Sequence, residues 1–157
     1  MEENSKILRL RVLLCFLKSN AEDCTVTGIS RTLGEEKYSV SRAVSSLEKD
    51  GYINRDDVRN PIITEKGYIA AQKYSERLEI TLNHLLYEGV DIESAKRDAF
   101  YWALYCSDST MEAVRATEER YRRCLLRQHQ HEERQQSAAV FHGQHLSARQ
   151  RQPRPSI

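Results

Sequence analysis

Apolar residues recur every three or four positions from Ile7 to Leu47, a spacing that predicts three successive helices. The first is expected to end at Ser19, the second at Gly34 and the third at Gly51, since glycine suits the left-handed turn that closes many helices. The residues expected to cap their N-termini are Asn4 or Ser5 for the first helix, Thr25 for the second and Ser39 for the third.

After Gly51 the spacing of apolar residues falls from about 3.6 to about 2, which is typical of strands. The segments YINR and IIT are expected to form two short strands, with the polar segment DDVRNP at the tip of a hairpin. Helical spacing then returns. Three more helices are expected: from Thr64 to about Glu88, from Asp91 to about Cys106, and from Ser107 or Asp108 to between Tyr121 and Leu126.

The order helix, helix, turn, helix, hairpin, helix is that of a winged helix-turn-helix. The expected fold class is therefore mainly α, with a winged helix-turn-helix DNA-binding domain at residues 1–67 and an all-helical dimerisation region at residues 68–127. Residues 128–157 are rich in Gln, Arg and His and have little apolar periodicity. They are expected to form a disordered basic tail.

The third helix is the expected DNA-reading element. With Val40, Val44 and Leu47 turned inward, its outward face carries short hydroxyls that let the backbone approach a major groove, while Arg42 reaches guanine edges. Free N–H groups at its N-terminus suit a phosphate, and the hairpin is expected to lie along the neighbouring minor groove or backbone. The candidate DNA-binding residues are Lys37, Tyr38, Ser39, Ser41, Arg42, Ser45, Ser46, Lys49, Arg55 and Arg59.

The formal net charge is only +1, and it is unevenly spread. From Arg120 onward the chain holds eight Lys or Arg against two Glu, whereas residues 1–70 hold eleven basic and eleven acidic residues. The balanced charge of the first part keeps a second interpretation open, in which the winged helix is a protein-interaction module that does not read DNA. The potential on the face of Ser41, Arg42 and Lys49 distinguishes the two.

Several other classes of function have no support in the sequence. No apolar run is long enough to span a bilayer, and the start MEENSKILRLR lacks the features of a signal peptide, so we expect no membrane partner and a cytoplasmic location. The four cysteines form no C-x-x-C pair. No nucleotide-binding, hydrolase or zinc-protease motif occurs, so we expect no enzymatic activity.

The run from Thr25 to Ser107 resembles the metal-dependent transcriptional repressors of the diphtheria toxin repressor and manganese transport regulator type. The segments that carry the resemblance are SVSRAVSSLEKDGYI, ITEKG and RLEITLNHLLYEGVD. It implies a homodimer, formed by the helices after the hairpin, that binds a palindromic operator and usually needs manganese or iron. It also implies DNA contacts from Tyr38, Ser39, Ser41 and Arg42.

The metal ligands of that family do not carry over to this chain. The family takes carboxylates from its first helix, but none occurs here between Glu3 and Glu22. The other matched ligand positions hold Leu78, Phe100, Ala103 and Leu104, which offer no donor to a divalent ion. We therefore expect no cofactor; a relocated metal site built from His84, Asp98 and Cys106 is the alternative.

Two further questions stay open at this stage. The aromatic run AFYWALYC is expected to form core and dimer interface, with an apolar effector pocket as the alternative. Regulators of the multiple-antibiotic-resistance type share the winged helix and sense organic ligands. They usually place a dimerisation helix before the DNA-binding domain, whereas here the additional helices follow it, so that class is the second alternative.

Overall fold

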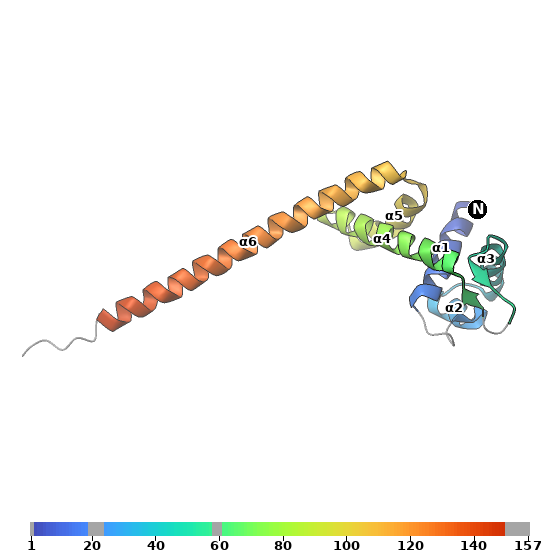
Figure 1. Cartoon of the computed structure of the whole chain (residues 1–157), viewed down its shortest axis with the longest axis horizontal. Helices are drawn as coiled ribbons and strands as arrows, with labels where there is room; N and C mark the ends of the chain where they lie inside the picture. Colours follow the sequence, from blue (N-terminus) through green and yellow to red (C-terminus); the bar gives the residue numbers. More distant parts are fainter. Residues whose placement is uncertain (1, 19–23, 58–60, 150–157) are drawn as a thin grey trace, which may run out of the picture. The chain divides into compact units, whose positions relative to one another are not determined.

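The computed structural model describes residues 2–18, 24–57 and 61–149. Contacts group the chain into two units, residues 1–114 and 115–157. The order of elements is that of a winged helix-turn-helix followed by helices, which confirms the expected mainly α fold class. The elements are α1 (Glu2–Lys18), α2 (Val26–Leu33), α3 (Lys37–Lys49), β1 (Ile53–Asn54), β2 (Ile62–Ile63), α4 (Glu65–Tyr87), α5 (Ile92–Tyr105) and α6 (Asp108–Arg149) (Figure 1).

Helix α1 is the centre of the first unit. It contacts α2, α3, α4, α5 and β2, and five consecutive residues from Val12 to Phe16 are buried. A helix covered on several sides needs apolar residues around its circumference rather than along one stripe. It begins at Glu2, before the predicted caps Asn4 and Ser5, and the early carboxylates suit the positive end of the helix dipole.

The caps predicted for α2 are confirmed. Thr25 Oγ1 accepts a hydrogen bond from the N–H of Gly28 at 3.1 Å, and Gly34 closes the helix in the left-handed conformation with a φ of 67°. The packing of the two helices is also as expected, since Ile29 of α2 and Leu47 of α3 are each 1% exposed.

The predicted cap of α3 at Ser39 is wrong. The helix begins at Lys37, and the N–H of Val40 donates to the carbonyl of Glu36 at 3.0 Å. The reason is the turn before it: Ser30 Oγ donates to the carbonyl of Glu35 at 2.6 Å, which fixes the chain so that helical bonding starts directly afterwards. Ser39 therefore lies inside the first turn of α3.

The expected hairpin is present as an antiparallel pair with Ile53 opposite Ile63. The segment ITEKG joins it to α4. Thr64 Oγ1 accepts from the N–H of Gly67 at 3.0 Å and donates to the carbonyl of Gly51 at 2.7 Å. A Cβ at Gly67 would lie 2.0 Å from the carbonyl oxygen of Tyr52, so only glycine permits this approach.

Helices α4 and α5 lie side by side and begin where the sequence predicts (Figure 1). Asp91 caps α5 through the N–H of Ser94 at 2.9 Å. Arg77 of α4 is only 8% exposed, and its guanidinium donates to the carbonyls of Ala103 at 2.9 Å and Cys106 at 3.1 Å. Arg77 also pairs with Asp108, so one buried cation joins α4, the end of α5 and the start of α6.

Helix α6 is longer than predicted. It continues to Arg149 instead of ending between Tyr121 and Leu126, so residues 128–149, which were expected to belong to a disordered tail, are helical in the structure, while residues 150–157 lie outside the described part. Apolar periodicity indicates that one face of a helix is buried. An exposed helix needs no such periodicity, because Gln, Arg, Glu and Ala favour the helical conformation by their own propensity. The absence of periodicity therefore did not argue against a helix here.

Candidate nucleic-acid interface

The outward face of α3 is fixed by the burial of its opposite side. Val40 and Val44 are fully buried, and the residues half a turn away from them, Tyr38, Arg42 and Lys49, are exposed. Tyr38 is 71% exposed, which is unusual for a tyrosine without a partner surface. The predicted candidates Lys37, Ser41, Ser45 and Ser46 lie around this face, Lys37 exposed and the three serines half-buried.

Arg42 is held along the helix by Tyr38. Its guanidinium carbon lies 5.9 Å from the centroid of the Tyr38 ring, a cation–π contact between residues one turn apart. Such a contact at an exposed site contributes about 0.5–1 kcal/mol. It restricts the side chain without burying its hydrogen-bond donors, so the guanidinium is available to a base edge or a phosphate.

Arg55, at the base of the hairpin, has a role that the sequence did not predict. Its side chain is 16% exposed, lies 3.6 Å from the carboxylate of Glu48 and donates to Ser45 Oγ at 3.1 Å. These contacts, both made by Nη1, fasten the hairpin to α3. Arg59, the other hairpin candidate, lies outside the described residues.

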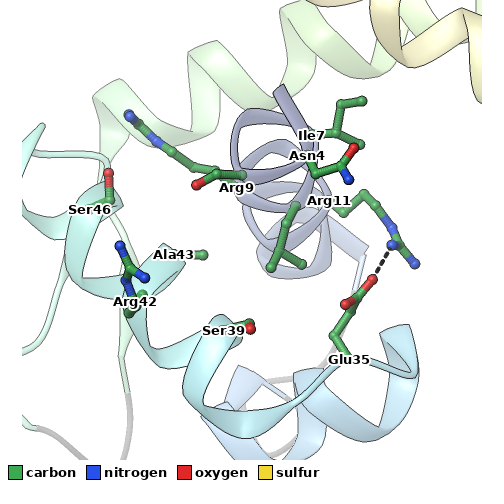
Figure 2. A pocket seen from close by; sticks show the side chains of 11 residues that line it. Asn4, Ile7, Arg9, Arg11, Glu35, Ser39, Arg42, Ala43 and Ser46 are labelled. Carbon is green, nitrogen blue, oxygen red and sulfur yellow. Dashed lines mark hydrogen bonds and ion pairs between the residues drawn. The ribbon is translucent and has the colours of Figure 1, made fainter. Parts of the chain in front are cut away.

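A polar cleft of about 570 Å³ separates the N-terminal half of α1 from α3 (Figure 2). Ser39, Arg42 and Ser46 line it from α3, and Arg9 and Arg11 line it from α1. Three guanidinium groups from two helices thus surround one cleft beside the outward face of α3. Glu35 also lines the cleft and pairs with Arg11, so the positive charge of the cleft is partly neutralised.

Arg9 and Arg11 were missed as candidates because they belong to a helix read as core. Arg11 pairs with Glu35 at 2.7 Å and donates to the carbonyl of Leu33 at 3.1 Å, while Arg9 pairs with Asp50. The available signal was two cations within an otherwise apolar helical segment, since a half-buried arginine favours a polar or acidic partner.

The positions matched to metal ligands do not fit a divalent ion. Ala103 is fully buried, and Leu78, Phe100 and Leu104 are half-buried. Within residues 2–18, 24–57 and 61–149, no three His, Cys, Asp or Glu side chains gather as a possible metal site. The structure therefore does not bring together the alternative ligands His84, Asp98 and Cys106.

The described helices include none that is both long and apolar enough to cross a membrane. The aromatic run of α5 is only partly covered, since Phe100, Tyr101 and Trp102 are half-buried and Tyr105 is 50% exposed. The rings of Tyr101 and Tyr105 stack with their centroids 6.4 Å apart.

Comparison with known proteins gives matches in sequence and in fold, although no protein-family model matches the chain. The transcriptional regulator MntR of Escherichia coli O6:H1 is 34% identical over 83 residues, which are 53% of this chain and 54% of the relative. MntR of Salmonella typhimurium is 33% identical over 84 residues, 54% of each protein. This chain therefore spans about half the length of the curated relatives it matches.

Among solved structures, the hypothetical protein SSo2273 from Sulfolobus solfataricus superposes with a TM-score of 0.53 at 19% identity, over 67% of this chain and 82% of that protein. This likeness supports the fold. The sequence matches agree with the resemblance indicated by the sequence, and over about half of its length the chain is similar to the transcriptional regulators named MntR.

Proposed function

We propose that this protein is a DNA-binding transcriptional regulator that acts as a homodimer and does not depend on a metal ion. The observation that carries DNA binding is the outward face of α3, on which Tyr38, Arg42 and Lys49 are exposed and flanked by small hydroxyl side chains. The sequence relation to regulators named MntR supports the same function.

The roles of the exposed residues follow from their chemistry. Arg42 carries a planar fork of donors that matches the two acceptors of a guanine in the major groove, whereas Lys49 presents a point charge suited to a phosphate. Ser41, Ser45 and Ser46 are short enough to let the helix backbone approach the bases. Arg9 and Arg11 of α1 lie beside this face, where they pair with Asp50 and Glu35.

The homodimer is supported by uncovered apolar side chains after the hairpin. Between Tyr68 and Ile92, five large apolar residues are 38% to 61% exposed. A symmetric partner would cover such residues. They are Tyr68, Ile69, Leu86, Tyr87 and Ile92.

Independence from metal is supported by the side chains at the matched ligand positions. Leu78, Phe100, Ala103 and Leu104 have no oxygen, nitrogen or sulfur donor in their side chains. Mn²⁺ and Fe²⁺ bind through several such donors converging on the ion. An ion without ligands in either conformation cannot shift the balance between them.

Selection of binding sites by the full-length protein tests the proposal. Purified protein is incubated with genomic fragments at about 0.15 M salt, where nonspecific attraction is partly screened. The bound fragments are sequenced and compared with those bound by an Arg42→Ala variant. We expect the unmodified protein to enrich a palindromic sequence, and the variant to enrich it more weakly, with a relaxed preference at one base pair per half-site. Enrichment of no sequence would contradict DNA reading and favour a protein-interaction module instead.

A further inference from the structure

A second cavity, of about 290 Å³, lies where α1, α3, α4 and α5 meet. It shares only Arg9 with the cleft between α1 and α3. Its deepest residues are leucines of α1 and α3 that are at most 3% exposed: Leu10, Leu13 and Leu47. Tyr74 of α4 and Leu104 of α5 line the side opposite α3.

The two charged residues that line this cavity, Lys6 and Arg9, are both basic. Among the described residues, no Asp or Glu belongs to the lining. Lys6 Nζ lies 5.8 Å from the ring centroid of Tyr105, and the Arg9 guanidinium lies 5.8 Å from that of Tyr52, so both cations are placed over aromatic walls. Arg9 also pairs with Asp50, which lies outside the lining and is half exposed to solvent.

Three tyrosine rings and apolar side chains form the rest of the walls, so the cavity matches a flat apolar body attached to a negative group. Its volume of about 290 Å³ lies just below the range of about 300–1,000 Å³ for small-molecule sites, so the ligand must be small. A single aromatic ring with a short carboxylate arm fits that size and charge.

We infer that this cavity binds a small aromatic carboxylate and that the bound ligand changes the affinity of the protein for DNA. Leu47 belongs to α3, and Tyr52 lies at the base of the hairpin. Tyr74 and Leu104, on the opposite side of the cavity, belong to α4 and α5. A ligand between these two groups contacts both, and it shifts their relative position if it binds one arrangement better. This second part rests on the proposed function.

Calorimetry on the full-length protein without DNA tests the site, with phenylacetate as the probe. Phenylethanol and phenylethylamine serve as neutral and cationic controls with the same ring. We expect one phenylacetate per chain, bound at least about tenfold more tightly than phenylethanol because of the charge-assisted contacts. Lys6→Gln should weaken the binding of phenylacetate about tenfold. Lys96 is exposed and lies outside the cavity, so Lys96→Gln should leave the affinity unchanged.

Two measurements locate the ligand without relying on one variant. Leu104→Trp should fill the cavity and abolish the binding of phenylacetate. The thermal unfolding midpoint of the variant shows whether it still folds. In the unmodified protein, methyl NMR signals of Leu10, Leu13 and Leu104 should shift on addition of phenylacetate. Absence of binding, equal binding of phenylethanol, or shifts confined to other leucines would each overturn the assignment of the site.

DNA affinity is then measured on the selected sequence with and without saturating phenylacetate. A change of about fivefold or more is expected from typical coupling energies. Binding of phenylacetate with unchanged DNA affinity would overturn the coupling. Failure to select any DNA sequence would instead contradict the proposed function, and the calorimetry would still decide whether the cavity is a carboxylate site.

Discussion

Arg42 and Lys49 both project from α3 into solvent, but their chemistry predicts different roles. Arg42 lies against the ring of Tyr38, which limits the directions its guanidinium can take. Lys49 is in the last turn of the helix, where a flexible ammonium reaches a phosphate more readily than a base edge.

Replacing each residue by alanine should therefore give different losses. Arg42→Ala is expected to weaken specific binding by about 1–3 kcal/mol and to relax the preference at one base pair per half-site. Lys49→Ala should lower the affinity for all sequences and reduce the salt slope by about one unit. Titrations of the selected and scrambled duplexes at several salt concentrations measure both effects. Equal, sequence-independent losses would contradict base reading by Arg42.

Gly67 provides a prediction about stability at the same scale. Gly67→Ala places a methyl group against the carbonyl of Tyr52, and neither backbone segment can move without disturbing the bonds of Thr64. We expect a loss of about 1–3 kcal/mol in the free energy of unfolding, despite the better helix propensity of alanine. Denaturant unfolding measures it. Gln72→Ala, exposed on the same helix, should change the stability by less than about 0.5 kcal/mol.

At the scale of elements, one junction joins three helices. Arg77 of α4 satisfies two carbonyls at the end of α5 and pairs with Asp108 at the start of α6. Carbonyls at a helix end have no partner within the helix. A buried cation that donates hydrogen bonds to them therefore stabilises the turn between α5 and α6. The same junction explains why α4 carries an arginine on its inner face.

The junction predicts a pH dependence. Lys73, and after it Arg77, lowers the pKa of Asp108 below its ordinary value of 3.8. The ionised form is favoured by folding, so the stabilisation is present above the unfolded pKa and is lost as the pH falls through the lower folded value. The difference in thermal midpoint between the unmodified protein and Asp108→Asn should be constant above about pH 5 and vanish in stronger acid. A difference that grew with acidity would contradict this origin.

At the scale of the whole molecule, the exposed apolar residues after the hairpin predict self-association. We expect a dimer at micromolar concentration in analytical ultracentrifugation. Leu86→Lys combined with Ile92→Lys, near the turn between α4 and α5, should shift the equilibrium toward monomer by burying unpaired charge. Ile62→Lys serves as the control, since Ile62 is also exposed, at 59%, but lies in the hairpin. A monomeric unmodified protein would count against the proposed homodimer.

The response to metal is the second property of the whole molecule. Mn²⁺ should neither bind stoichiometrically nor change the affinity for the selected DNA, because the matched positions provide no donors. Calorimetry with Mn²⁺ and DNA titrations with and without the ion check both statements. Micromolar binding that raised DNA affinity would contradict independence from metal and show that the ligands lie at other positions.

The sequence by itself determined the features that depend on a few neighbouring residues. Thr25, Thr64 and Asp91 cap their helices as predicted, since a side-chain cap reaches only two or three residues along the chain. The buried face of α3 follows equally from local spacing, through Val40 and Val44. The predicted start of α3 was wrong because the start depends on a longer turn, in which the Ser30 hydroxyl donates to the carbonyl of Glu35.

Only the tertiary structure decided which distant residues meet. Arg55 fastens the hairpin to Ser45, and Arg77 reaches carbonyls more than twenty residues away, pairings that depend on how the helices cross. The cavity under Lys6 and Arg9 arises in the same way, because four helices must meet before it exists. Local spacing fixes which side of a helix is apolar, but the packing angles that close a cavity depend on side-chain shapes along the whole contact.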